Sequence, residues 1–173
     1  ALSYKLLRHI NAAMYGMPRR IDSVKETITY LGLSTVKNLA CLFMLSAGGE
    51  HPHELLITAM MRAKMCERLA QVARLPATSA FFTVGLFSTL DALLNAPMVH
   101  VVKQLPLSED IQQALLEGKG PMAEALRCTL AYERGNWDEV RCFSLSRAAI
   151  KSAFLEAVVW VEFVDQEIAA IGQ

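Results

Sequence analysis

The chain has 173 residues, which is enough for one domain with a sizeable core, and two full domains are not expected. Its 17 basic and 17 acidic residues give a formal net charge of zero. This balance argues against a nucleic-acid-binding module, because such modules carry an excess of lysine and arginine that neutralises phosphates. The densest basic run, Arg19-Arg20, is interpreted as a solvated turn.

Helical periodicity, with glycine and proline at the ends of the patterns, predicts several helices in the first part of the chain. The Ser-x-x-Glu spacing of Ser23 and Glu26 is a capping box, in which each side chain bonds an otherwise unpaired amide of the first turn. Pro52 suits a first helical turn. The predicted helices cover residues 2–14, 23–32, 34–48 and about 52–74.

The most apolar window, residues 81–94, is the segment around which we expect the fold to be organised. Phe82, Leu86 and Leu90 recur at helical spacing, and other apolar residues cover most of the remaining faces. One continuous, central helix is therefore predicted across this window. The later predicted helices cover about 97–104, 108–117, 122–134 and 146–171, with a loop at 118–121 and a short turn at 136–139.

No segment alternates apolar and polar residues between strand formers and turn signals, so the predicted fold class is all-α. The loop at 118–121 could separate a main helical bundle, residues 1–117, from a C-terminal helical subregion, residues 121–173, packed on it. A connection of that length is also usual within one domain.

The stretch from 75 to 102 contains no basic residue and one acidic residue, Asp91, and is long enough to cross a bilayer. Pro76 and Pro97 bracket it, and polar residues interrupt it. A buried helix of a soluble protein is therefore preferred to a membrane span. The chain begins in helical register without a charged n-region, so we expect no secretory signal and a fragment cut from a longer protein.

Four cysteines lie far apart within apolar patterns, and no Cys-x-x-Cys spacing occurs. They are interpreted as reduced, buried thiols of a cytoplasmic protein. Their positions are Cys41, Cys66, Cys128 and Cys142.

Several motifs, in their order and spacing, resemble the HDOD domain, a relative of the HD phosphohydrolases. The opening has a leucine pair, an asparagine before small residues, and a helix that ends in Leu-Gly. These residues are Leu6-Leu7, Asn11, Ile21-Asp22-Ser23 and Leu31-Gly32. Further motifs resemble the HDOD subgroup that follows an N-terminal EAL domain. They lie at residues 53–56, 82–88, 105–108 and 132–137, so the likeness covers nearly the whole chain.

This resemblance implies an HD-domain-like helical bundle of about eight to ten helices, truncated at its N-terminus because the HDOD pattern includes helices before Leu2. It also implies an output or interaction module of bacterial signalling. In the EAL-containing subgroup the N-terminal part resembles cyclic-di-GMP phosphodiesterases. The implied partners are therefore an EAL-type domain of the same polypeptide and other signalling proteins, with a homodimer as a further option.

An HD hydrolase holds its metal with a His-Asp pair on a central helix and with further ligands on neighbouring helices. By the resemblance, Ser88 and Thr89 fall on that pair, and Thr58 falls on a histidine position of the preceding helix. Neutral hydroxyls are poor substitutes for imidazole and carboxylate. We therefore expect a degenerate site with no metal, no cofactor and no catalytic residue.

The histidines are interpreted as ordinary residues. His51 and His53 form the only histidine cluster of the sequence, but no third ligand lies at metal-binding spacing nearby, so a solvated loop is preferred to an adventitious ion site. His9 and His100 stand alone, and a general base needs a positioned partner.

Two further polar residues lie in apolar surroundings. Asp91 is expected at a helix edge in contact with water, rather than as an acid in a cleft. Asn11 is interpreted as a buried amide bonded to backbone, rather than as a ligand contact. Gly118-Lys119-Gly120 lacks the spacing of a phosphate-binding loop, and no nucleotide-binding motif occurs elsewhere in the sequence.

These observations favour a non-catalytic regulatory domain that transmits a signal by protein contact. A sensor that binds a small molecule or nucleotide in the inherited HD-fold pocket, without hydrolysis, is the alternative, and hydrolysis at a relocated site is a third hypothesis. The terminal helix is apolar over more than one face, including Val159 and Trp160. Its surplus apolar surface could dock the absent N-terminal domain or a second copy of the chain.

Overall fold

The computed structural model describes residues 53–105 and 107–171. This part of the chain contains helices and connecting turns and no strand, which confirms the all-α fold class. The helices are α4 (His53–Val72), α5 (Thr78–Phe87), α6 (Leu90–Leu94), α7 (Met98–Gln104), α8 (Glu109–Leu116), α9 (Gly120–Glu133) and α10 (Arg147–Ile171).

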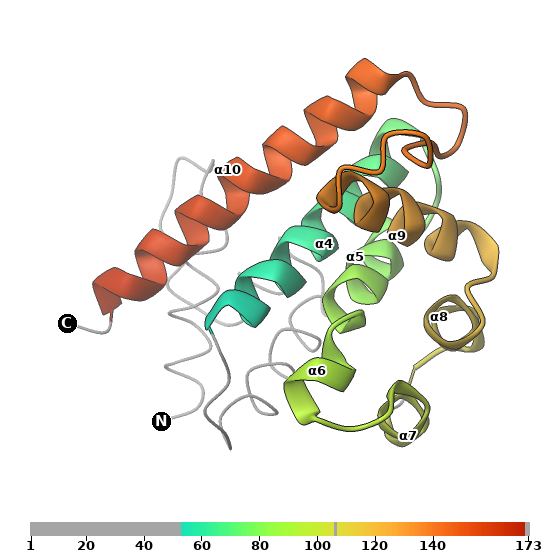
Figure 1. The fold of residues 1–173 in the computed structure, drawn as a ribbon, viewed down its shortest axis with the longest axis vertical. Coiled ribbons are helices and arrows are strands. Elements are labelled where there is room, and N and C mark those ends of the chain that lie inside the picture. The colour runs from blue at the N-terminus through green and yellow to red at the C-terminus, as the bar shows by residue number, and fades with distance from the viewer. Residues whose placement is uncertain (1–52, 106, 172–173) are drawn as a thin grey trace.

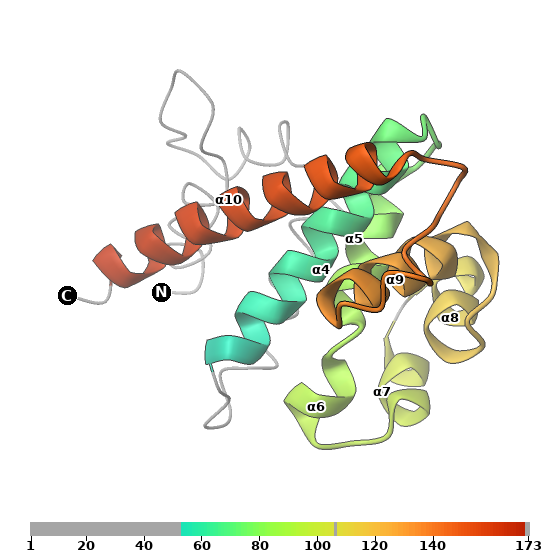
Figure 2. The ribbon, with the colours of Figure 1, turned by 45° about the horizontal axis from the view of Figure 1, so that its top comes forward.

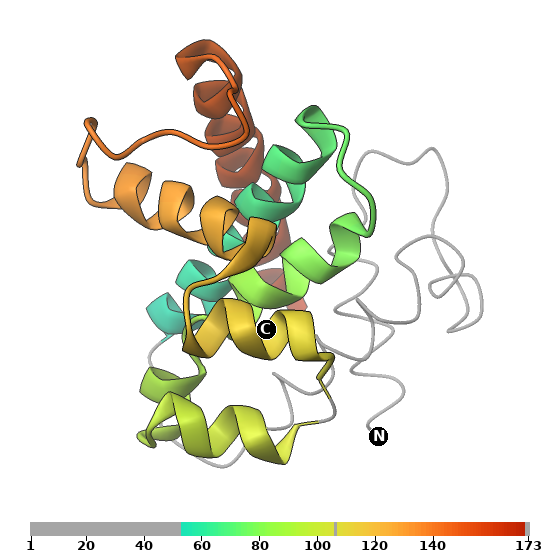
Figure 3. The ribbon, with the colours of Figure 1, turned by 90° about the vertical axis from the view of Figure 1, so that its right-hand side faces the viewer.

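Helix α4 lies at the centre of the described fold. It has α10 on one side and α5 and α9 on the other, and it contacts all three (Figure 1, Figure 2). Helices α8 and α7 follow one beyond the other next to α5 and α9 (Figure 3). A residue on the inner side of α4 can therefore reach helices that are far apart in the sequence.

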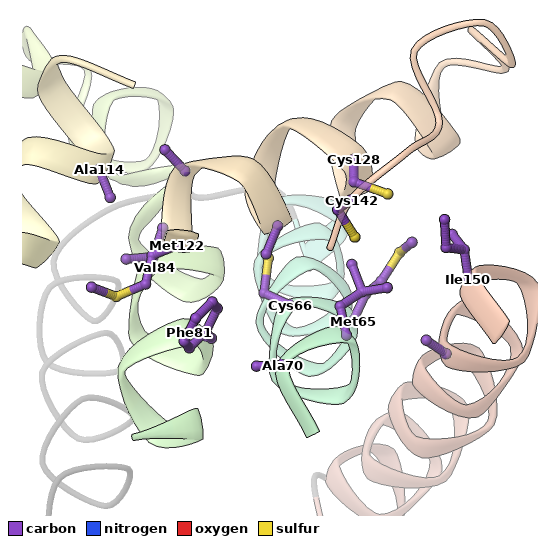
Figure 4. Packing of buried hydrophobic residues seen from close by; sticks show 14 of the residues in the cluster. Met65, Cys66, Ala70, Phe81, Val84, Ala114, Met122, Cys128, Cys142 and Ile150 are labelled. Atoms are coloured by element: carbon purple, nitrogen blue, oxygen red, sulfur yellow. The ribbon is translucent and has the colours of Figure 1, made fainter. Parts of the chain in front are cut away.

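The core unites residues from α4, α5, α8, α9 and α10. Every residue from Phe81 to Phe87 is buried, as the apolar window predicts. One core cluster includes Cys66, Val84, Ala125 and Ala153 and thus joins four helices (Figure 4). Burial of a large aliphatic or aromatic side chain contributes about 1.5–3 kcal/mol, so this shared core holds the helices in fixed positions.

The predicted continuous helix across residues 81–94 is wrong, because the structure divides it into α5 and α6. The interruption lies at Ser88 and Thr89. Their hydroxyl groups donate hydrogen bonds to the carbonyl oxygens of Gly85 and Leu86, at 2.8 Å and 3.4 Å. Serine and threonine hydroxyls compete in this way with the backbone bonds of a helix. The apolar periodicity continues through the break, and the sequence pattern therefore gave no sign of it.

Gly85 marks a close approach of α5 to α4. A Cβ atom at this position would lie 2.4 Å from the carbonyl oxygen of Arg62 and 2.6 Å from the Cα atom of Ala63. Both are backbone atoms, which cannot move aside as a flexible side chain can. The absence of a side chain at Gly85 therefore lets the C-terminal end of α5 rest directly on α4.

The other predicted boundaries lie close to the observed ones, with one exception. Gly120 and Pro121 belong to the first turn of α9, not to a loop, while Gly118 has a positive φ of 65° at the junction with α8. A proline in the first turn is favourable because its missing N–H would have no helical partner there. The predicted helices before residue 52 lie outside the described residues, and the division into 1–117 and 121–173 stays a prediction.

Candidate functional site

The three hydroxyl residues that sequence motifs place at HD ligand positions all donate hydrogen bonds to backbone carbonyl oxygens three or four residues earlier in the chain. Thr58 on α4 donates a hydrogen bond to the carbonyl oxygen of Glu54, at 2.8 Å. Ser88 follows the last residue of α5 and is half-buried, whereas Thr89 is buried. As their bonds to Gly85 and Leu86 show, each hydroxyl satisfies a nearby carbonyl. These hydroxyls stabilise local backbone.

The charged group beside Ser88 is the guanidinium of Arg62, on the inner side of α4. Its Nη1 atom donates to the Ser88 hydroxyl oxygen at 3.4 Å. Its Nε and Nη2 atoms donate to the two carboxylate oxygens of Glu133, each at 2.8 Å. Such a two-pronged pair is among the stronger hydrogen-bonded ion pairs in proteins. The side chain of Arg62 is 16% exposed and that of Glu133 37%.

Arg62 thereby joins three helices at one point. Its side chain reaches Glu133 at the end of α9 and Ser88 at the end of α5, and its backbone lies against Gly85. We call Arg62, Ser88 and Glu133 the arginine junction. Sequence reasoning did not single out Arg62, and it included Glu133 only as part of the motif at residues 132–137. The one sequence signal for Arg62 was its position one helical turn after Thr58. Its partner Glu133 lies 71 residues further along the chain, so no local pattern connects the two.

The donor set of the arginine junction does not suit a divalent cation. Hydroxyl groups are weak ligands for transition metals, and a guanidinium has no lone pair to offer. The Glu133 carboxylate binds Arg62 through both oxygens. Among the described residues, no group of three histidine, cysteine, aspartate or glutamate side chains is placed to hold a metal ion.

The remaining candidates lie apart from the junction. His53 is the first residue of α4, so it belongs to a helix and not to the predicted loop. Its Nε2 atom lies 2.7 Å from Oδ1 of Asp165 on α10. His100 is exposed on α7. Asp91 is exposed, as expected, and its carboxylate accepts a hydrogen bond from the amide of Ala92. His9, Asn11 and His51 lie outside the described residues.

A cavity of about 710 Å³ lies between α9 and the segment before α10, away from the arginine junction. Thr58, Ser88 and Thr89 are not among its lining residues. The lining residues are Glu124, Arg127, Glu139, Arg141, Cys142, Phe143, Ser144 and Leu145.

The described cysteines are buried free thiols, as predicted, at Cys66, Cys128 and Cys142. Burial raises the pKa of Cys66 to about 12, against the opposing hydrogen bond with Thr129. Cys41 lies outside the described residues. None of the described helices combines the length and apolar character that a bilayer crossing requires.

The α-helical fold and the motifs agree with a comparison against known families. The family model described as "HDOD domain" matches residues 1–117. The chain therefore belongs to the HDOD domain family.

Curated relatives include a Vibrio cholerae protein named cyclic di-GMP phosphodiesterase CdgJ. It is 31% identical over 174 residues, which cover 97% of this chain and 40% of that protein. The uncharacterized protein YuxH of Bacillus subtilis is 29% identical over 170 residues, which cover 92% of this chain and 41% of that protein. The chain thus spans about two fifths of the length of these relatives. No solved structure is significantly similar to the chain.

Proposed function

We propose that this chain is a non-catalytic regulatory domain of a cytoplasmic signalling protein. It acts through contact with an EAL-type domain of the same polypeptide, a cyclic-di-GMP phosphodiesterase, and with other signalling proteins. The observation that carries this proposal is the arginine junction. At the positions where the family resemblance implies metal ligands, this chain has hydroxyls bonded to backbone, and beside them a guanidinium bonded to a carboxylate.

Electrostatics support the degenerate site. The guanidinium of Arg62 stays protonated across the physiological range, so its positive charge is permanent. An incoming divalent cation beside Ser88 would be repelled by that charge, and in a partly buried site water screens the repulsion poorly. Displacing Arg62 would also break two hydrogen bonds to Glu133. The site therefore favours its own side chain over a metal ion.

The surface of α10 supports the contact role. Leu155 is 49% exposed and Val159 is 66% exposed, one helical turn apart on the side of α10 that α4 does not cover. Trp160, by contrast, packs edge-on against Phe82, so it is not part of this surplus. We name Leu155 and Val159 the α10 patch and assign it to the EAL-type domain, because the curated relatives are more than twice as long as this chain.

The proposal is tested in the complete polypeptide by measuring cyclic-di-GMP turnover. Leu155→Glu and Val159→Glu should change the rate several-fold, because a charge in an apolar contact must be desolvated. Lys151→Glu is the matched control, since it places the same charge one turn before Leu155, at an already charged and exposed position. Unchanged rates in both patch variants would contradict the assigned contact. If the 173-residue chain alone turned over cyclic-di-GMP, and a metal chelator abolished that turnover, the non-catalytic role would be contradicted.

The sensor alternative is separated by thermal unfolding in the presence of nucleotides and divalent ions. A ligand of the folded state raises the melting temperature as its concentration increases. Saturable stabilisation by a nucleotide, abolished by Arg62→Met, would favour a sensor that uses the inherited pocket. The absence of any shift is the result expected for a domain that acts through protein contact. A second copy of the chain on the α10 patch would instead give a concentration-dependent dimer, which Val159→Glu would dissociate.

A further inference from the structure

The cavity between α9 and the segment before α10 has charged residues of both signs in its lining. That segment runs back alongside α9 before α10 begins (Figure 1, Figure 2). Arg127 and Arg141 line the cavity together with Glu124 and Glu139, so the formal charges of its lining cancel. A polyanion would find no excess of positive charge there. The balance instead fits a ligand that carries one charge of each sign.

Most of these charged groups have no protein partner. Within the part of the chain that the structure describes, Arg127, Arg141 and Glu139 take part in no ion pair. Arg127 donates one N–H to the carbonyl oxygen of Gly118, and the other N–H groups of its guanidinium have no acceptor among the described residues. Opposite charges that line one cavity without joining each other are free to bind a ligand.

Glu139 and Arg141 lie on either side of a tight turn. The Arg141 amide donates a hydrogen bond to the Glu139 carbonyl oxygen at 2.8 Å, and Val140 between them is buried in the core. A carboxylate and a guanidinium therefore leave the backbone two residues apart. This spacing suits a ligand whose own ammonium and carboxylate groups are attached to the same carbon atom.

The next turn is strained and firmly held. Phe143 and Ser144 have left-handed backbone with φ of 49° and 55°, which non-glycine residues adopt at a cost in free energy and which recurs at ligand-binding sites. The Phe143 amide donates to the Glu124 carboxylate at 2.7 Å, and the Phe143 ring packs edge-on against Phe81 at 6.2 Å. Ser144 is exposed, lines the cavity and has no hydrogen bond to a described residue. Glu124 thus holds the turn, and Ser144 offers an unused amide and hydroxyl.

We propose that this cavity binds a free α-amino acid as its zwitterion. Arg127 and Arg141 hold the carboxylate, because the planar guanidinium matches the two oxygens of a carboxylate. Glu139 accepts hydrogen bonds from the ammonium group. Phe143 and Leu145 give the side chain of the amino acid an apolar contact, and about 710 Å³ is within the usual range of small-molecule sites.

This site is separate from the arginine junction. None of the junction residues lines the cavity, and the charged residues of the cavity lie on α9 and in the segment that follows it. The inference therefore does not depend on the proposed regulatory function, and either can fail without the other.

The test is isothermal titration calorimetry of the intact chain with each of the common amino acids in turn. We expect at least one of them to bind saturably, with one site per chain. Its carboxamide and its N-acetyl derivative should each bind at least about tenfold more weakly, because each lacks one charged hydrogen-bonding group. These two derivatives differ from the amino acid only at the groups that the proposal assigns to the protein's charges.

Variants connect each ligand group to its residue. Arg141→Met should weaken binding at least about tenfold, and Glu139→Gln should reduce the affinity for the amino acid to that of the N-acetyl derivative for the wild type. Arg134→Met is the matched control, since Arg134 is an exposed arginine at the end of α9 that does not line the cavity. It should leave the affinity within about twofold, because salt screens a charge that does not touch the ligand.

Circular dichroism of each variant establishes that the helices are intact. The proposal is overturned if no amino acid binds saturably, or if binding persists unchanged in both Arg141→Met and Glu139→Gln. An equal loss of affinity in Arg134→Met would also overturn it, because binding would then reflect diffuse charge and not a defined site. Equal binding of the amino acid and its N-acetyl derivative would overturn the role assigned to Glu139.

Discussion

Arg62 and Glu133 form a two-pronged ion pair that connects α4 to the end of α9, with both nitrogen–oxygen distances at 2.8 Å. The pair spans 71 residues of sequence, and the same guanidinium also reaches Ser88 at the end of α5. Three helices that share the core therefore meet at one charged side chain. Its removal should affect stability more than the removal of an ordinary surface charge.

Arg62→Met should lower the free energy of unfolding by about 1–3 kcal/mol, because Glu133 and Ser88 lose their shared donor while the apolar stem is retained. Urea unfolding followed by circular dichroism measures the change. Lys119→Met is the matched control, since Lys119 forms an ion pair with Glu117 that is exposed on both sides. Equal stability of the Arg62 variant and the wild type would contradict the role of the arginine junction.

Gly85→Ala should destabilise the chain by about 2–4 kcal/mol, because the added methyl group would collide with the backbone of Arg62 and force α5 away from α4. Gly120→Ala serves as the comparison. Nothing lies within 4 Å of a Cβ atom there, so only the positive φ of 82° should destabilise Gly120→Ala, by about 1 kcal/mol of unfolding free energy. If thermal or urea unfolding ranks the two variants in the opposite order, the close approach of the helices is not the dominant effect.

Cys66 should make stability fall at high pH. Burial raises the pKa of its thiol in the folded state from 9.0 to about 12, so the unfolded state loses its proton first. The resulting stabilisation is complete below pH 9 and is lost as the pH rises toward 12, by on the order of 4 kcal/mol. Cys66→Ala should unfold with a shallower pH dependence above pH 9. Met65→Ala, at an equally buried neighbour, should lower stability at every pH without changing that slope.

Local signals predicted most of the described helices well. The apolar spacing and the proline near residue 52 predicted a helix close to His53–Val72, and Pro97 and Ser108 placed the starts of α7 and α8 within a residue or two. These signals depend on side chains within a few turns of each other, and a single sequence records them directly.

Two features could not be predicted in the same way. The break between α5 and α6 depends on whether the Ser88 and Thr89 hydroxyls turn back to their own carbonyls, and the apolar pattern runs on through Leu90 in either case. The pairing of Arg62 with Glu133 depends on the arrangement of α4 and α9, which local spacing does not encode. Family motifs in the sequence pointed to the hydroxyl residues of the candidate site. Only the fold identified the charged residues beside them, Arg62 and Glu133.

The guanidinium of Arg62 is attached to the chain, so it cannot diffuse away as a bound ion does. We therefore expect the contact of α4 with α5 and α9 to persist when divalent metal ions are removed, because the group that joins these helices is part of the chain.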